Sequence, residues 1–291
     1  MKQFIFFVMM VCACNAMAQP KIITQATINT TTTVTAPEEE DVTTIQNQGG
    51  GGGGAAMFRN FGDGETKSVT QVKNEMVKTV MKSDMGRSTI IRNNGTKLTS
   101  LLIEMMGNKT GFYATDEEQA DMRKRMDSMM QARTKDSAAA NTRRPQQAAP
   151  VEISYTDETK KIAGYTCKKA YLISTRFLGI KDTAIVWFTP DFKINNVTST
   201  GGGFSMGMGN TAGALGGLEK IDGFVMRYET KMRRNRTMIV EVTKVDLAKE
   251  IADKDFDIPK DFEMKPMKEM RNMMGGGAGG QGNQIMIQRS N

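Results

Sequence analysis

The sequence predicts a mainly β domain: an antiparallel sheet with one or two helices, flanked by glycine-rich arms. β-Branched and aromatic residues alternate in short segments, most clearly over residues 161–190. Turn signals such as Asn94-Gly95 separate these segments. Only one long segment, residues 115–133, has the period of an amphipathic helix. With the Gly- and Thr-rich tracts set aside, roughly 180–200 residues remain, enough for one domain with a hydrophobic core.

Residues 1–18 have the pattern of a secretory signal peptide. A lysine precedes a short apolar run, Phe4 to Ala13, which is too short to span a bilayer. Ala16-Met17-Ala18 fits the small-residue cleavage rule and places the mature N-terminus directly after it. An alternative stays open, because Val11-Cys12-Ala13-Cys14 is a degenerate lipoprotein signal. Lipidation at Cys14 would anchor the protein to a membrane.

Residues 19–67 are predicted to be a low-complexity, disordered or loosely attached segment. They hold a Thr run (Thr30–Thr33), an acidic cluster (Glu38–Asp41) and a glycine run (Gly49–Gly54), with no apolar periodicity. The acidic cluster lacks the spaced ligands of a calcium loop, so a solvated charge run is expected. Order is predicted to begin near Ser68, with strands over residues 69–82, 88–92 and 97–106, a turn at 107–111 and a short strand at 112–114.

The helix predicted over residues 115–133 begins with a capping-box spacing, Thr115 to Glu118. Acidic residues fill its first turn, where they suit the helix dipole. Four methionines of this helix form a stripe on one side. A helix that packs on the sheet through this stripe is one interpretation; the alternative is a lid over a cavity, in which the methionines line a ligand site. The stripe consists of Met122, Met126, Met129 and Met130.

The central element is a predicted hairpin that pairs Cys167–Thr175 with Thr183–Thr189. Alternation places Ile185 and Trp187 on one face, and Ala184, Val186 and Phe188 on the other. Both faces are apolar, so each is expected to be covered. Trp187 is therefore the second candidate, beside the four methionines, for lining an apolar ligand site.

A last hairpin is predicted over Phe224–Thr230 and Thr237–Val245. Its basic turn, residues 231–236, is expected to be solvated, with contact to anionic lipid headgroups as the alternative. Three later apolar residues are expected to close the core: Phe256, Ile258 and Phe262. The single domain is placed at residues 68–270, with flexible insertions near 134–150 and 201–217 and a disordered tail at 271–291.

The composition argues against catalysis. The chain has no histidine, which removes the commonest general base and the commonest metal ligand. Cys167 is the only cysteine beyond the leader, so a buried, inert thiol is expected and no disulfide or thiolate metal cluster. Gly203–Gly207 matches the G-x-S-x-G pattern, but no histidine exists to activate its serine. We therefore predict no catalytic residue, no metal site and no cofactor.

The charge favours acidic partners. Formal net charge is +7, and the one lysine in the leader leaves +6 on the processed chain, which suits acidic partners or anionic membrane surfaces. Nucleic acid is not predicted, because the basic turn lacks interleaved aromatic residues. The 25 methionines are either a compositional habit or a pliable apolar surface.

Several segments, taken together, resemble the domain of unknown function 4412 family. They are GRSTIIRNNGTKLTSLLIEMMGNKTGFYATDEEQADMRKRMDSM, KKIAGYTCKKA, DTAIVWFTP, KIDGFVMRYE and FDIPKDFE. The resemblance covers about residues 68–268 and implies a secreted, periplasmic or outer-membrane-associated protein of Gram-negative bacteria. This family is similar to the outer-membrane lipoprotein carriers (LolA-like), which implies a sheet curled into an incomplete β-barrel with helices over an apolar cavity. It supplies no agreed catalytic residues.

Two functions stay open. The first is a carrier or sensor of an apolar ligand, a lipid or an acylated protein, held in a half-barrel cavity. The second is a structural or interaction module of the envelope with a filled core. A large apolar cavity beneath the methionine helix would favour the first, and a filled interior the second. The sequence does not indicate an oligomeric state.

Overall fold

The computed structural model describes most of the predicted domain and part of the segment before it. The described residues are 20–35, 64–83, 86–135, 151–175, 181–194, 197, 217–232 and 236–270, with the backbone alone at 83, 123, 126, 127 and 129–135. The strands are β1 (Lys21–Ile23), β2 (Gln25–Thr35), β3 (Gly64–Lys73), β4 (Met76–Ser83), β5 (Gly86–Asn93), β6 (Leu98–Met105), β7 (Asn108–Thr115), β8 (Val151–Ile162), β9 (Tyr165–Thr175), β10 (Lys181–Thr189), β11 (Phe192–Ile194), β12 (Phe224–Lys231), β13 (Thr237–Asp246) and β14 (Glu263–Pro266). The helices are α2 (Asp116–Lys135), the 3-10 turns η5 (Leu218–Lys220) and η7 (Asp253–Phe256), and a short helix at 267–270.

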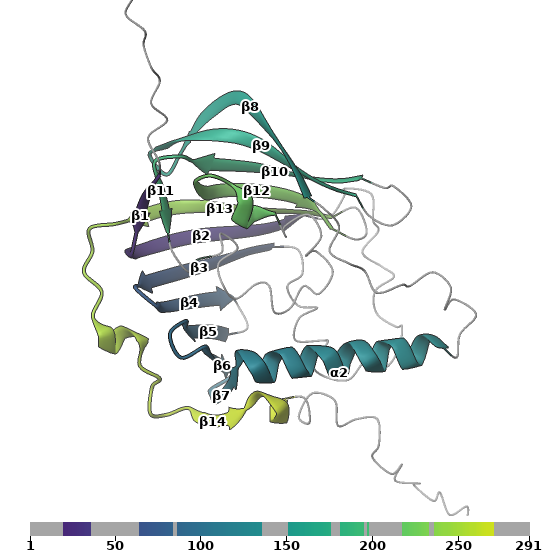
Figure 1. Cartoon of the computed structure of the whole chain (residues 1–291). Coiled ribbons are helices and arrows are strands. Elements are labelled where there is room, and N and C mark those ends of the chain that lie inside the picture. Colours follow the sequence, from purple (N-terminus) through teal and green to yellow (C-terminus); the bar gives the residue numbers. More distant parts are fainter. Residues whose placement is uncertain are drawn as a thin grey trace, which may run out of the picture.

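The fold is mainly β, as predicted. One twelve-stranded sheet has the order β14-β7-β6-β5-β4-β3-β2-β13-β12-β10-β9-β8, and β1 and β11 form a two-stranded sheet (Figure 1). The twelve-stranded sheet is mixed, which corrects the prediction of an antiparallel one, because β14 pairs with β7 in parallel; the two strands of the small sheet also pair in parallel. In the described part of the chain, no pairing joins the two edge strands, β14 and β8, so the sheet is open.

The largest correction concerns β2, which lies in the middle of the sheet between β3 and β13. The disorder prediction for residues 19–67 is therefore wrong over 21–35. The next strand, β3, begins at Gly64, before the predicted start of order at Ser68, and residues 36–63 lie outside the described part. Ala26, Ile28 and Val34 alternate inward and are buried. The Thr run between Ile28 and Val34 adopts the extended conformation of a strand, because a β-branched side chain suits a pleated strand even where it is polar.

Two predicted boundaries also need correction. Residues 69–82 form two strands, β3 and β4, which turn at Asn74 with φ at +51°, a conformation that asparagine tolerates. The turn predicted at 107–111 is tighter, at Met106-Gly107, so that β7 already begins at Asn108. The Asn94-Gly95 turn joins β5 to β6 as predicted.

Both later hairpins form as predicted. β9 pairs with β10 throughout, and β12 pairs with β13. Only one residue of the predicted insertion at 201–217, Gly217, is described, and of 134–150 only residues 134–135, the end of α2, are. The predicted tail at 271–291 lies outside the described residues.

The core of the sheet packs in two large clusters, and two smaller ones lie at the end of the sheet that contains β5–β7. The first gathers the inward residues of β9, β10 and β12, with Leu172, Val186 and Tyr228 fully buried, and is capped by Leu218 and Ile221. The second contains a row of aromatic rings: Phe192 stacks on Phe224 at 5.3 Å between centroids and meets Tyr165 edge-on at 5.1 Å. Among the described residues, no helix is both long enough and apolar enough to cross a membrane.

Candidate binding groove beneath a charged strap

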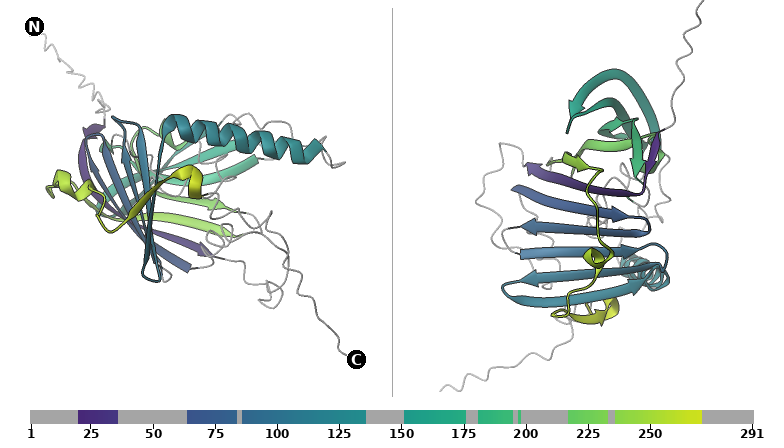
Figure 2. Two further views of the ribbon diagram at one scale, coloured as in Figure 1. Left: turned by 90° about the horizontal axis from the view of Figure 1, so that it is seen from below. Right: turned by 90° about the vertical axis from the view of Figure 1, so that its left-hand side faces the viewer.

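A segment near the C-terminus crosses one face of the sheet. We call residues 247–262 the strap, and the face of β2–β7 that it crosses the outer face (Figure 2). The strap contains η7 and leads into β14, the edge strand. Five of its residues are acidic and three are lysines, so its net charge is −2.

Apolar side chains fix the strap to the sheet. Ile251 and Phe256 are buried against Ile91 of β5 and Leu102 of β6. Ile258 and Phe262 pack at the margin of the same cluster, which confirms the prediction that they help to close the core. Burial of a side chain of this size contributes about 1.5–3 kcal/mol.

Charged contacts flank this cluster at both ends of the strap. Lys73 of β3 lies 2.7 Å from Asp253, and Lys109 of β7 lies 2.5 Å from Asp261. The hydrogen bond to Asp261 raises the pKa of Lys109, and the same bond lowers the pKa of Asp261. The Lys78 ammonium of β4 donates to the main-chain oxygen of Asp255 at 2.5 Å. The outer face thus binds an acidic polypeptide segment of its own chain.

Two hollows lie beside the strap. The larger, about 530 Å³, is open to solvent, and the smaller measures about 180 Å³. Lys78 and Pro259 line both, so the two hollows form one groove between the strap and the sheet. The remaining lining is mostly charged: Lys249, Lys254, Asp255 and Asp257 in the larger, and Arg87, Glu104, Lys109 and Asp261 in the smaller.

Trp187, predicted to line an apolar site, stands on β10 away from this groove. It is half-buried at the margin of the second core cluster. Lys160 and Lys169 cover its ring, with their ammonium groups 4.5 and 5.8 Å from the ring centroid. Such cation–π contacts stabilise an aromatic ring that remains partly exposed. The pKa of Lys160 is lowered, chiefly by burial and then by repulsion from Arg227. Of the two apolar faces predicted for β10, one is therefore buried in the core, and on the other long charged side chains cover the tryptophan.

Met122 lies on α2, at the other end of the sheet from β10 (Figure 1). Its side chain is half-buried against Phe112 and Ala114 of β7 and Met267 of the short C-terminal helix. Trp187 and Met122 thus belong to different clusters, and the structure does not bring them together. The side chains of Met126, Met129 and Met130 lie outside the described residues.

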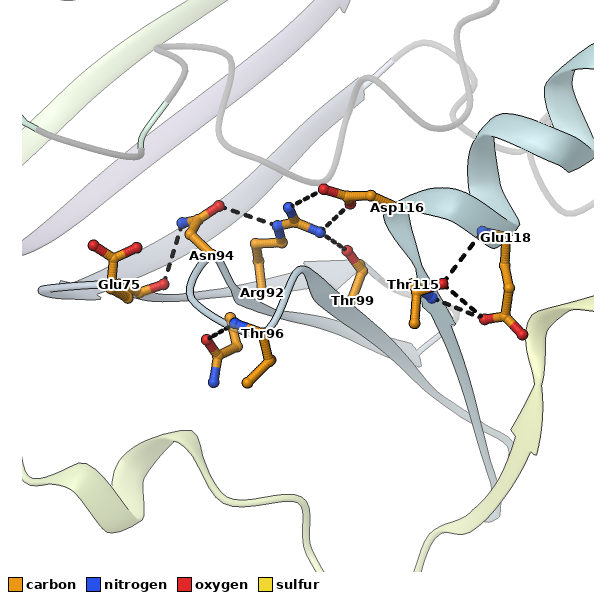
Figure 3. Close-up of polar contacts among 9 residues, drawn as sticks. Glu75, Arg92, Asn94, Thr96, Thr99, Thr115, Asp116 and Glu118 are labelled. Carbon is orange, nitrogen blue, oxygen red and sulfur yellow. Dashed lines mark hydrogen bonds and ion pairs between the residues drawn. The ribbon is translucent and has the colours of Figure 1, made fainter.

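The start of α2 is anchored through polar contacts (Figure 3). The predicted capping box is confirmed: Glu118 N–H donates to Thr115 Oγ1 at 3.2 Å, and Thr115 N–H donates to Glu118 Oε2 at 2.9 Å. Arg92 of β5 binds Asp116 through two hydrogen bonds, one of 2.7 Å, and also donates to Thr99 at 3.1 Å. The hydrogen bonds from Arg92 lower the pKa of Asp116. The sheet thus fixes the first turn of α2.

Cys167 is fully buried, as predicted. Burial raises the pKa of its thiol to about 11, so the thiol is protonated at neutral pH. Within the described ranges, no three acidic or cysteine side chains converge as a metal site would require.

Sequence reasoning missed the outer-face groove. Its lysines and aspartates are visible as charge runs, but they meet only through the pairing of β3–β7 and the return of the strap from more than a hundred residues away. The one local signal was the alternation of acidic and apolar residues in the strap, as in Asp255-Phe256-Asp257-Ile258.

Solved structures resemble the chain only remotely. A structure of PNGF-II is 17% identical, with 86% of this chain and 33% of that chain covered and a TM-score of 0.37. MucB in complex with MucA(peri) is 9% identical, with 81% and 55% covered and a TM-score of 0.36. This chain therefore spans about a third of PNGF-II and about half of MucB. No curated protein matches it. The family model described as "Domain of unknown function (DUF4412)" matches residues 65–262, more than half of the sequence, and the chain belongs to that family.

Proposed function

We propose that this chain is a non-catalytic binding module of the cell envelope, which holds a partner on the surface of its sheet. The observation that carries the proposal is a contrast. Buried apolar side chains form the two large core clusters, whereas the two hollows described above lie outside, beneath the strap, among charged residues. Ligand sites for apolar molecules are concave and mostly apolar, which this groove is not.

The packing of the first core cluster supports a filled interior. Leu172, Val186 and Tyr228 have no more than 1% of their surface exposed. Leu218 and Ile221 close the cluster from the segment before β12. A cavity among such residues would cost stability, about 20 cal/mol for each Å² of cavity surface, unless a ligand filled it.

The envelope location rests on the leader and on the family. Residues 1–18 read as a secretory signal peptide, and the resemblance implies a periplasmic or outer-membrane-associated protein. The absence of catalysis rests on the lack of histidine and on the buried thiol of Cys167.

One observation favours the alternative, a carrier of an apolar ligand. An incomplete barrel of the LolA-like kind requires an open sheet, and this sheet is open between β8 and β14. In that case the sheet curls around a lipid or an acylated protein, and α2 acts as the lid of the cavity, with Met122 on the side of the helix that faces the sheet. The two functions differ in whether an apolar molecule occupies the interior.

Native mass spectrometry of the protein purified from its own envelope separates them. We expect the mass of the polypeptide without bound lipid. Vesicles of the envelope phospholipids should leave both the melting temperature and the Trp187 fluorescence unchanged, because a filled interior offers a lipid no site. A co-purifying lipid whose removal lowers the melting temperature would establish the carrier instead, since only a ligand of the folded state stabilises it.

A further inference from the structure

An unbroken row of side chains in register runs along the outer face of β2–β7 and continues on the same side of β13, β12, β10 and β9. Its basic part falls on β3, β4 and β5, where Lys67 is opposite Lys82 and Lys82 is opposite Arg87. We call these three residues the basic row. From β9 to β7 the full row is Lys169, Trp187, Arg227, Glu241, Thr31, Lys67, Lys82, Arg87, Glu104 and Lys109.

The basic row is exposed and poorly neutralised. All three side chains are exposed, with 76% of the Lys67 side chain in solvent. Lys67 pairs with Glu65 at 3.2 Å, an exposed contact that contributes little. Among the described residues, neither Lys82 nor Arg87 forms an ion pair. Arg87 has Glu104 opposite it on its other side, but Lys82 lies between two like charges, Lys67 and Arg87. Like charges directly opposite each other destabilise a sheet, so the position of Lys82 weakens the fold unless an anion faces it.

The strap shows what kind of anion this face accepts. On β3–β5 the outer face carries five cations and one acid: Lys67, Lys73, Lys78, Lys82, Arg87 and Glu65. The strap meets Lys73 and Lys78 with Asp253 and the backbone of Asp255, while its Ile251 and Phe256 enter the core. An acidic segment with interspersed apolar residues therefore already occupies one half of this face.

The other half offers the same two features. Val69 and Val80 are directly opposite each other, one position along the same face from Lys67 and Lys82, and 38% of the Val69 surface is exposed. Val80 and Arg87 also line the smaller hollow, next to Pro259 of the strap. Cations, apolar side chains and a hollow thus recur side by side, next to the strap.

Building on the proposed binding function, we propose that the basic row, together with Val69 and Val80, is the docking surface for an extended acidic segment of a partner protein, which lies beside the strap. Acidic side chains of the segment face Lys82 and Arg87. Its apolar side chains, two residues away on the same side of the segment, cover the two valines and enter the smaller hollow.

The test is a fluorescence-anisotropy titration of the full mature chain with a labelled peptide in which Asp and Leu take turns at every second residue, with Ser between them, so that both lie on one side of an extended chain. A second peptide, with Asn in place of Asp, is the control ligand. We expect the aspartate peptide to bind more tightly, with an affinity that falls as salt is raised. The double variant Lys82→Glu/Arg87→Glu should weaken binding about tenfold or more, because it reverses both charges at the docking surface.

The matched control is Lys168→Glu/Lys181→Glu, which makes the same change in net charge at exposed residues of β9 and β10. It should leave the affinity within about twofold of the unaltered chain. The glutamates at positions 82 and 87 are again like charges opposite each other, and one of them lies opposite Glu104, so the melting temperature of this variant is measured as well. Lys82→Gln/Arg87→Gln removes both charges together with their repulsion, so its melting temperature should not fall, and it should also weaken binding. The exchange Lys82→Arg/Arg87→Lys should keep the affinity.

Several outcomes would overturn the proposal. Equal binding of the Asp and Asn peptides would mean that the charge of the peptide does not matter. An equal loss of affinity in both double variants would mean that only the net charge of the protein matters, and not the basic row. Binding to phosphatidylglycerol vesicles but not to the peptide, abolished by Lys82→Glu/Arg87→Glu, would assign the row to a lipid surface. If the peptide binds only after the acidic side chains of Glu38–Asp41 have been replaced by neutral ones, the occupant of the basic row is the chain's own acidic cluster. None of these outcomes bears on lipid in the interior, which native mass spectrometry reports separately.

Discussion

At the scale of single residues, Cys167 is the clearest case in which composition and structure agree. A lone cysteine on an apolar strand was expected to be buried, and burial raises the pKa of its thiol to about 11. At pH 8 the native thiol is therefore protonated and enclosed, so we predict very slow labelling by a disulfide reagent. The labelling rate should rise sharply at the urea concentration of the unfolding midpoint. Rapid labelling of the native chain would mean that Cys167 is accessible after all.

Gly223 shows what could not be predicted at this scale. A Cβ atom built at this position would lie 2.2 Å from the main-chain oxygen of Thr189, a contact that backbone cannot easily relieve. We predict that Gly223→Ala lowers the free energy of unfolding by about 1–3 kcal/mol. Gly164→Ala is the control without a close approach: its φ of +88° also strains an alanine, as the +157° of Gly223 does, but its Cβ would meet nothing within 4 Å. Chemical denaturation of both variants gives the comparison, and a smaller loss for Gly223→Ala than for Gly164→Ala would contradict this account.

At the scale of elements, local signals succeeded and distant pairings failed. The start of α2 was predictable because Thr115 and Glu118 are three residues apart. The place of β2 was not, because its neighbour β13 lies some two hundred residues away and its own sequence is largely threonine. The candidate residues Trp187 and Met122 were each assigned to the right type of element. Their separation depends on the strand order, which no local pattern encodes.

The link between Arg92 and Asp116 gives a prediction for α2. Its hydrogen bonds lower the pKa of Asp116, so this carboxylate stabilises the folded state above its unfolded pKa of about 3.9. That contribution is lost as pH falls through the lower, folded value. Arg92→Ala should therefore speed amide exchange in the first turn of α2 at neutral pH and have little further effect in strong acid. Arg87→Ala, on the other face of β5, should not change this exchange at either pH; an equal change in both variants would show that α2 does not depend on Arg92.

At the scale of the whole molecule, the strap connects the outer face from β2 to β7. Phe256 anchors it in a cluster shared with Ile91 and Leu102, so we predict that Phe256→Ala lowers the free energy of unfolding by about 3–5 kcal/mol. Ile22→Ala, at a residue that is 60% exposed, should cost far less. Urea denaturation of the two variants decides the point. Equal losses would mean that the strap only rests on the surface.

The central position of β2 also has a consequence for how the chain reaches its folded state. β2 to β7 pair in sequence order and can assemble as they emerge, but the second edge of β2 has to wait for β13. Until then a strand of eleven residues without a single charged side chain presents its open edge to its surroundings. Long-range pairing of this kind is slow to form, and an unpaired edge invites association with other chains. A chain that enters its compartment N-terminus first would therefore depend, during this interval, on a chaperone that shields β2.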